Sequence, residues 1–252
     1  MKNKVALVTG SGRGIGKGIA KVLANAGYDL LLHYNTSKEQ TLQLADEVGR
    51  IGIRVFTVQA NLSTYAGVER MFLECHKCVD IIDLMVYNSG VTAGCSFLDM
   101  KEETFDLVTA VDWKGCFFST QFATKWMIET QTKGNVVIIT SNQQQMIFPR
   151  GSAYGSVKAA ALRFTKQAAV ELAPYGIRVN AIAPGYTDTK EPRMYINRNK
   201  EDTYPFIPLK RWCDPEEIGH SVLFLDSCHA ESITGLNLLM DGGACLDSKL
   251  MP

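Results

Sequence analysis

The chain has 252 residues, of which 46% are hydrophobic, and its 26 lysines and arginines equal its 26 aspartates and glutamates. This length and composition predict one domain over residues 1–252 with a substantial core. The balanced charge excludes a global field that would attract nucleic acid or an anionic membrane. The first residues lack the apolar stretch of a signal peptide, and no run approaches ~18 apolar residues, so we expect a cytoplasmic protein with no membrane partner.

Apolar, β-branched runs alternate with helical patterns along the whole chain. Helices are expected over 14–27, 37–50 and 152–176, near 63–78 and from 214 onward. Between them, strands are expected at 4–9, 29–34, 53–58, 82–87, 135–140, 177–182 and 235–241. These runs lack polar alternation, as expected for strands that are buried on both faces of a parallel sheet. The alternation predicts an α/β fold with a doubly wound parallel sheet.

Residues 187–211 interrupt this alternation. The segment is polar, contains three prolines and follows the carboxyl end of an expected strand. Open α/β sheets bind ligands at that edge. We therefore expect a substrate-binding lid there.

The seven cysteines are odd in number and scattered, which is typical of reduced thiols. Cys75 and Cys78 in "ECHKC" have C-x-x-C spacing, but no second pair supplies the other ligands of a zinc site. The pair also falls at the end of a helical pattern, whereas a redox pair would stand at its start. We expect idle thiols and no metal site.

A glycine-rich loop, "VTGSGRGIGKG", follows the first expected strand and opens the first helix. Its glycines do not form G-x-G-x-x-G, but Gly10, Gly14 and Gly16 form G-x-x-x-G-x-G. Such a loop turns tightly without Cβ atoms and presents backbone amides at a helix N-terminus, which suits a pyrophosphate. The candidate contacts are Gly10, Ser11, Arg13, Gly14, Ile15 and Gly16.

Taken in order, "TGSGRGIG", "NSG" (88–90), "YGSVK" and "PGYTDT" resemble the motifs of the short-chain dehydrogenase/reductase family. The resemblance continues through "ELAPYGIRVNAIAPG" and "ITGLNLLMDGG". It implies a Rossmann-type sheet of about seven strands flanked by helices on both faces, and a homodimer or homotetramer assembled through two long middle helices. The implied activity is NAD(P)-dependent interconversion of a carbonyl and an alcohol. Sugar and polyol dehydrogenases and 3-oxoacyl-[acyl-carrier-protein] reductases are the similar subgroups.

The second expected strand ends in "HYNTSK", without the carboxylate that usually binds a ribose 2′-hydroxyl. Arg13 can instead contact a 2′-phosphate, together with Asn35, Thr36 and Ser37. We therefore expect NADP(H) to be preferred and NAD(H) to remain possible.

The resemblance implies further cofactor contacts. "ANLS" matches the adenine-binding segment, with asparagine where the family has aspartate, and "YNSG" matches Asn-Asn-Ala-Gly at its second and fourth positions only. The segment after "IAPG" is implied to meet the carboxamide and the phosphates. These residues are Asn61, Leu62, Asn88, Gly90, Pro184, Gly185, Thr187 and Thr189.

Proton transfer to an alkoxide needs a positioned acid, and a tyrosine with a nearby ammonium can serve in both directions. Three Tyr–Lys pairs have the i,i+4 spacing, but only Tyr154 and Lys158 lie in a helical pattern that aligns them on one face. Ser141 ends an upstream strand. By resemblance, Ser141 orients the carbonyl, Tyr154 transfers the proton, and Lys158 also holds the nicotinamide ribose.

"DWKG" places Asp112 where the family usually has the asparagine that is implied to organise a proton-relaying water. An ionised aspartate accepts hydrogen bonds but cannot donate them. A carboxylate near Lys158 would raise the lysine pKa and weaken the effect of Lys158 on Tyr154. We expect an active enzyme with a shifted pH profile.

"NQQQMIFPRG" follows Ser141, and Gln143, Gln144 and Gln145 can bind hydroxyl groups or simply face water. With Tyr186 as a further contact, they favour a sugar or polyol substrate. One alternative is a 3-oxoacyl-[acyl-carrier-protein] reductase, although "ETQTKG" offers only one lysine for docking a carrier protein. Another alternative is a catalytically silent protein that only binds nicotinamide.

Replacement of Arg13 by alanine tests the cofactor prediction. Because a guanidinium recognises the extra phosphate of NADPH, Arg13→Ala should weaken NADPH binding far more than NADH binding. Fluorescence titration with both cofactors measures this difference. Equal losses for the two cofactors would contradict the assignment.

Overall fold

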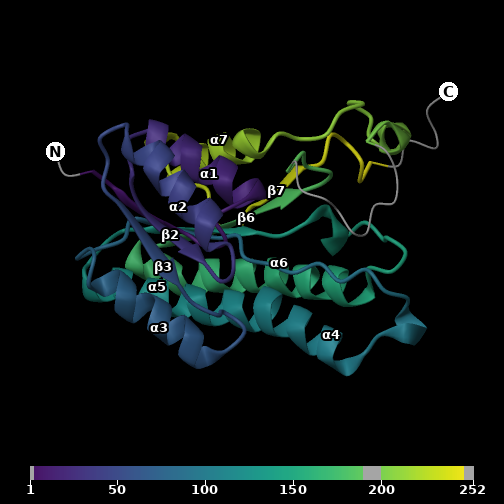
Figure 1. Ribbon diagram of the computed structural model, residues 1–252, viewed down its shortest axis with the longest axis horizontal. Coiled ribbons are helices and arrows are strands. Elements are labelled where there is room, and N and C mark those ends of the chain that lie inside the picture. Colours follow the sequence, from purple (N-terminus) through teal and green to yellow (C-terminus); the bar gives the residue numbers. More distant parts are fainter. Residues whose placement is uncertain (1–2, 190–199, 247–252) are drawn as a thin grey trace.

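Seven parallel strands form one sheet in the order β3-β2-β1-β4-β5-β6-β7 in the computed structural model, which describes residues 3–189 and 200–246 (Figure 1). The strands are β1 (Val5–Val8), β2 (Asp29–Tyr34), β3 (Val55–Gln59), β4 (Leu84–Tyr87), β5 (Asn135–Ile139), β6 (Arg178–Pro184) and β7 (Asn237–Met240). Every strand expected from the sequence is present, with ends that differ by a few residues. The prediction of a doubly wound α/β sheet is confirmed.

Helices cover both faces of this sheet. The first face carries α1 (Gly14–Asn25), α2 (Lys38–Gly49) and α7 (Pro215–Leu225) (Figure 1). The second face carries α3 (Tyr65–His76), α5 (Cys116–Glu129) and α6 (Ser152–Leu172), with the short α4 (Glu102–Val108) beside them. A seven-residue π-helix, Thr109–Gly115, joins α4 to α5. The sequence patterns did not resolve α4, the π-helix or α5.

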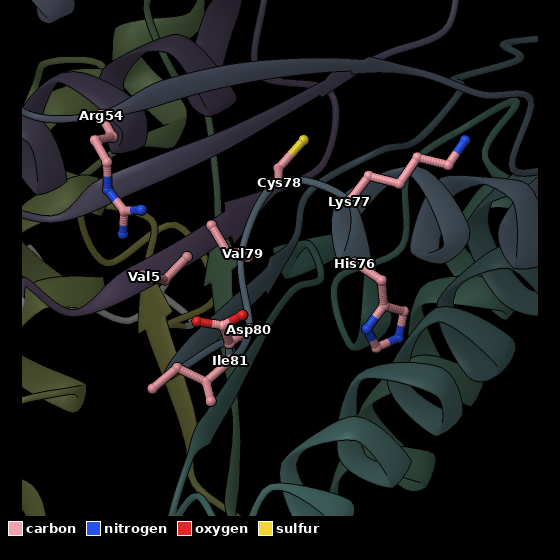
Figure 2. A pocket seen from close by; sticks show the side chains of 8 residues that line it. All are labelled: Val5, Arg54, His76, Lys77, Cys78, Val79, Asp80 and Ile81. Atoms are coloured by element: carbon pink, nitrogen blue, oxygen red, sulfur yellow. The ribbon is translucent and has the colours of Figure 1, made fainter.

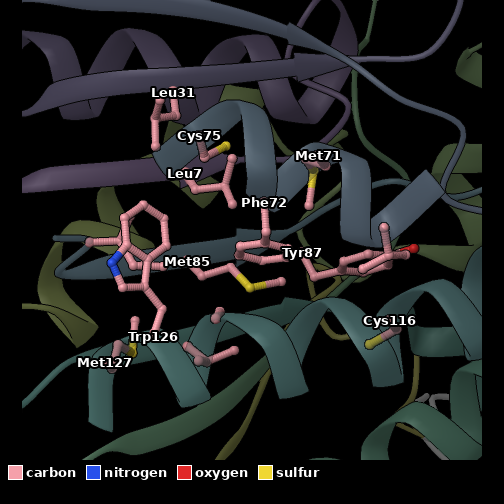
Figure 3. Packing of buried hydrophobic residues seen from close by; sticks show 14 of the residues in the cluster. Leu7, Leu31, Met71, Phe72, Cys75, Met85, Tyr87, Cys116, Trp126 and Met127 are labelled. Atoms are coloured by element: carbon pink, nitrogen blue, oxygen red, sulfur yellow. The ribbon is translucent and has the colours of Figure 1, made fainter. Parts of the chain in front are cut away.

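The two faces have separate cores because side chains alternate along each strand. Leu7 and Met85 point to the α3/α5/α6 side, whereas Ala6 and Val8 point to the α1/α2/α7 side. The first of these cores is rich in aromatic and sulfur-containing side chains (Figure 3). There the Phe72 ring meets Trp126 edge-on at 6.4 Å between centroids.

The strand order reverses between β1 and β4, which lie side by side although two β-α units separate them in the chain. In such sheets, ligands bind where the strand order reverses, beyond the carboxyl ends of the strands. The glycine loop follows β1, the "NSG" segment follows β4, and Ser141 follows β5. The topology therefore collects the sequence motifs at one edge of the sheet.

The expected lid over residues 187–211 falls partly outside the described residues, which stop at 189 and resume at 200. The second part contains a 3₁₀ helix, Glu201–Phe206. Within residues 3–189 and 200–246, no helix has both the length and the apolar character needed to cross a membrane.

Close packing of α1 against α7 depends on Gly18. A Cβ atom at this position would lie 2.6 Å from the carbonyl carbon of Pro215. We expect Gly18→Ala to lower the free energy of unfolding by about 2 kcal/mol, because the two helices must separate. Gly49→Ala is the control, since a Cβ there meets nothing within 4 Å and alanine favours the helix. Urea unfolding of both variants measures the difference, and equal effects would contradict this account of the packing.

Candidate active site

The glycine loop has a backbone that side chains would disrupt. Gly10 and Gly14 adopt left-handed conformations, with φ of +62° and +53°. A Cβ on Gly16 would collide with the Gly10 carbonyl oxygen. The first turn of α1 has no acidic residue, and its N-cap, Arg13, is exposed and makes no side-chain capping bond. The helix N-terminus is therefore open to an anion.

Asn88 and Thr9 fasten the glycine loop to the end of β4. The Asn88 side-chain amide donates to the carbonyl oxygens of Thr9 at 3.0 Å and Gly10 at 3.1 Å. The Thr9 hydroxyl in turn accepts from the backbone N–H groups of Asn88 and Ser89 at 2.9 and 3.0 Å. Because only the backbone N–H of Ser89 takes part in these bonds, the departure from the family motif at this position leaves them in place.

His33, near the end of β2, also holds the loop, although no sequence motif marks it. Its Nδ1 accepts from the Gly10 N–H at 3.2 Å, so Nε2 carries the proton and donates to the Ala60 carbonyl at 3.1 Å. Burial lowers the pKa of His33 to about 4. The imidazole is therefore neutral at physiological pH. A polar residue among the apolar residues of β2 was the available signal.

The residues expected to select the cofactor lie beside the loop. Asn35 and Thr36 are exposed at the end of β2. Ser37 is half-buried, and a Cβ on Gly12 would meet its hydroxyl oxygen at 2.7 Å. Ser37 therefore lies directly against the glycine loop at Gly12, the residue before Arg13.

Asn61 and Leu62 stand at the end of β3. Asn61 is exposed, and its side-chain oxygen accepts from the Ser63 N–H at 3.1 Å, which closes a short turn. Leu62 is buried in the second-face core. The structure therefore presents Asn61, and not Leu62, at the sheet edge.

The segment after β6 approaches the glycine loop from the other side. A Cβ on Gly14 would lie 3.2 Å from Cγ2 of Thr189. Thr187 is buried and forms a parallel bridge to Cys213. Pro184 ends β6, and Gly185 packs closely against Asp241. These contacts place both threonines at the edge where the candidate cofactor residues gather.

Ser141, Tyr154 and Lys158 come together at the carboxyl end of β5. Ser141 is buried, and its hydroxyl accepts from the Gln143 N–H at 3.2 Å. Tyr154 and Lys158 lie one turn apart on α6, with Nζ 5.4 Å from the centroid of the tyrosine ring. Lys158 is 4% exposed and donates to the Ile139 carbonyl at 3.2 Å. This hydrogen bond fixes the ammonium at the end of the strand that carries Ser141.

Asp112 reaches the same place from the π-helix. One carboxylate oxygen lies 3.0 Å from Lys158 Nζ, and the other accepts from the Val91 N–H at 2.8 Å. The wider turn of the π-helix is supported by the Tyr87 hydroxyl, which donates to the Val111 carbonyl at 2.5 Å. Asp112 and Lys158 thus form a buried ion pair behind Tyr154.

The expected substrate residues have different environments. Gln144 donates to the Asn237 side chain at 2.8 Å, so its amide is engaged with β7. The side-chain oxygen of Gln143 lies close to Gly151, at 2.8 Å from where a Cβ would be, and Gln145 is exposed. Gln144 therefore supports the sheet edge, whereas its two neighbours remain candidate substrate contacts; nothing in the sequence distinguishes the three glutamines.

Tyr186 belongs to an aromatic wall that the sequence analysis did not anticipate. Its ring stacks on Trp212 at 5.7 Å and meets Phe148 edge-on at 6.2 Å. Trp212 donates to the Thr203 hydroxyl at 2.6 Å. The wall joins the loops after β5 and β6 to the segment before α7, residues that are far apart in the chain.

A small cavity of about 100 Å³ lies elsewhere (Figure 2). Its lining includes Val5, the first residue of β1, so it opens at the amino end of the sheet, opposite the motifs. Arg54 in its wall is paired with Asp29 at 2.7 Å, and Lys77 with Glu74 at 2.7 Å. Arg54 and Lys77 are therefore already engaged in ion pairs.

Comparison with known proteins agrees with this geometry. The family model described as enoyl-(acyl carrier protein) reductase matches residues 10–245. The chain is 36% identical over 241 residues to the 3-oxoacyl-[acyl-carrier-protein] reductase FabG of Staphylococcus epidermidis. The matched region covers 96% of this chain and 98% of FabG. The chain belongs to the short-chain dehydrogenase/reductase family. Its fold and chemistry are those of an oxidoreductase that acts on CH–OH and C=O groups and binds NAD(P).

Two solved structures show the same similarity. The acetoin dehydrogenase from Enterobacter cloacae superimposes with a TM-score of 0.90 at 32% identity, covering 100% of this chain and 99% of that one. The angucycline C-6 ketoreductase LanV, solved with bound NADP, gives a TM-score of 0.89 at 30% identity and covers 96% of each chain. The match to these structures extends over nearly the whole chain.

The lowered pKa of His33 predicts an acid-sensitive fold. In the unfolded chain, His33 binds a proton below its ordinary pKa of about 6.5. In the folded chain, it binds that proton only near pH 4. The free energy of unfolding should therefore fall between these values, by on the order of 3 kcal/mol from this residue. Urea unfolding at pH 7 and pH 4 measures this loss. His33→Asn should reduce the loss and His220→Asn, on the exposed side of α7, should not; identical pH dependence in all three proteins would contradict the assignment.

Proposed function

We propose that this protein is an NADP(H)-dependent oxidoreductase that interconverts a carbonyl and a secondary alcohol on a small polar substrate, with residues 1–252 acting as one domain. The observation that supports this most is the convergence of Ser141, Tyr154 and Lys158 at the end of β5, with Nζ 5.4 Å from the Tyr154 ring. A serine and a tyrosine at this edge supply two hydroxyl donors to one carbonyl oxygen. The lysine supplies the charge that makes tyrosine a usable acid and base.

Each residue has a distinct role in this proposal. Bound nicotinamide supplies or accepts the hydride. The Ser141 hydroxyl donates a hydrogen bond to the carbonyl oxygen and polarises it. Tyr154 gives that oxygen its proton during reduction and removes the proton during oxidation. Lys158 stabilises the phenolate form of Tyr154 and stays in place through its bond to the Ile139 carbonyl.

The glycine loop and its neighbours would hold the cofactor. Its tight turns and the open N-terminus of α1 suit the pyrophosphate, and Thr189 approaches Gly14 from the β6 side, with Thr187 two residues before it. Two observations support a preference for NADP(H) over NAD(H): β2 ends without a carboxylate, and Arg13 is exposed and follows Gly12, which packs against Ser37. The related LanV carries NADP in its structure.

The substrate in this proposal is a small hydroxyketone, sugar or polyol. The aromatic wall of Phe148, Tyr186 and Trp212 offers flat surfaces and one phenolic hydroxyl, and Gln143 and Gln145 add amides near Ser141. The related acetoin dehydrogenase is named for a small hydroxyketone. Residues 187–211 are proposed to cover this site as a lid.

The 36% sequence identity to FabG favours a second candidate function, that of a 3-oxoacyl-[acyl-carrier-protein] reductase. That activity needs an acidic carrier protein to dock beside the site. A 3-oxoacyl thioester in the substrate panel separates the two candidates, because the first predicts efficient turnover only of the small polar ketones.

We also propose a homo-oligomer that assembles through α5 and α6. On the second face, Phe117 of α5 and Trp113 of the preceding π-helix both contact Phe164 of α6, at 4.9 and 5.6 Å between ring centroids. On the same helix Val170 is 72% exposed. Apolar side chains presented by two long helices suit a contact between copies of the chain.

Tyr154→Phe tests the proposed chemistry. Loss of the phenolic proton should lower kcat by ~10²- to 10⁴-fold on whichever ketone is reduced, while NADPH binding stays intact. NADPH oxidation at 340 nm and fluorescence titration measure the two quantities. Tyr175→Phe, at an exposed position after α6, is the matched control. Unchanged turnover in Tyr154→Phe would contradict the mechanism, and NADPH binding without turnover of any carbonyl would favour a catalytically silent protein.

A further inference from the structure

Asp112 is 1% exposed and contacts Lys158, which lies next to Tyr154. The Val91 N–H fixes one carboxylate oxygen at 2.8 Å, so the other is held toward Lys158 at 3.0 Å. A Cβ on Gly90 would lie only 2.7 Å from this second oxygen. The absence of a side chain at Gly90 therefore leaves the room in which the carboxylate meets the lysine.

Four groups that can carry a proton belong to the elements around the Asp112 carboxylate. Tyr154 and Lys158 come from α6, Cys116 from the start of α5, and Tyr87 from β4. Burial raises the pKa of the Cys116 thiol to about 12, and burial also raises the pKa of Tyr87. Both groups are neutral at physiological pH. Asp112 and Lys158 therefore carry the charges among these groups.

Asp112 and Lys158 stabilise each other as ions. Burial lowers the pKa of Lys158, but the carboxylate of Asp112 raises it further, and the net direction is upward. For Asp112, burial raises the pKa and the ammonium lowers it, with a net rise. The ammonium is thus charged over the whole working pH range, and an ammonium at 3.0 Å favours the carboxylate form of its partner.

We propose that Asp112 is a positioning residue that acts through Lys158: by neutralising the ammonium, it keeps Tyr154 protonated through the neutral pH range. This site then runs carbonyl reduction at its plateau near neutral pH and reaches its plateau for alcohol oxidation only in alkaline solution. The inference rests on the proposed function and adds to it the direction for which the site is prepared.

The reasoning follows from the protons in each direction. In reduction, the carbonyl carbon gains the hydride and its oxygen gains the proton of Tyr154, which later regains one from water. Oxidation runs the same steps in reverse and must begin with the phenolate. A lone ammonium 5.4 Å from the ring would favour that phenolate, whereas a carboxylate 3.0 Å from the ammonium opposes this attraction. The overall equilibrium is unchanged; only the pH range of each plateau moves.

A tyrosinate titration tests this without substrate or cofactor. Absorbance near 295 nm is followed with pH, and subtraction of the Tyr154→Phe protein isolates Tyr154 from the other tyrosines. Asp112→Asn removes the charge and keeps an oxygen that can accept from Val91. It should lower the pH at which Tyr154 ionises by about one unit or more. Asp106→Asn, which removes an exposed charge on α4, should leave that pH unchanged.

The kinetic readout is the pH profile of kcat/KM for oxidation. Its midpoint should move down in Asp112→Asn by the same amount as the titration, giving about tenfold faster oxidation near neutral pH per unit moved. A phenolate already present at neutral pH in the unaltered protein overturns the proposal, even if Asp112→Asn fails to fold. Unshifted midpoints in a folded Asp112→Asn protein also overturn it. A shifted titration with no turnover of any carbonyl instead supports the effect of Asp112 on Tyr154 and contradicts the proposed function.

Discussion

The hydrogen bonds between the ends of β1 and β4 are the constraint on which the candidate site depends. Thr9 and Asn88 join the two strands where the strand order reverses, and the same amide of Asn88 holds the Gly10 carbonyl. His33 supports Gly10 from β2. The glycine loop is therefore fixed from both sides before any ligand arrives, so that little conformational entropy remains to be lost on binding.

The second feature is the buried ion pair between Asp112 and Lys158, next to Tyr154. Lys158 reaches across from α6 to the Ile139 carbonyl, and Asp112 meets it from a π-helix that the Tyr87 hydroxyl stabilises. π-Helical turns often occur at functional sites, because they aim a side chain that a regular helix would direct elsewhere. Here the turn brings a carboxylate to a buried lysine, so the ammonium next to the Tyr154 ring is paired with an acidic side chain.

The sequence was sufficient for the sheet and the motifs but not for their supports. Uninterrupted apolar runs such as "VALV" within "KVALVT" predicted buried parallel strands because both faces are covered. Asp112 was found only through its departure from a familiar motif, and the π-helix that aims it has no pattern of its own. His33, Phe148 and Trp212 were missed because their partners are backbone groups or rings distant in the chain. The three glutamines are alike in sequence, and only the contact with Asn237 distinguishes Gln144.

The central claim is that the site transfers a hydride to a carbonyl while Tyr154 supplies the proton. Mass spectrometry after incubation with NADPH deuterated at C4 tests it most directly, across a small hydroxyketone, a keto sugar and a 3-oxoacyl thioester. The account predicts one deuterium on the carbinol carbon of a small polar product, and labelling slower by ~10²- to 10⁴-fold with Tyr154→Phe. Cofactor that binds but leaves every carbonyl in the panel unlabelled would contradict it.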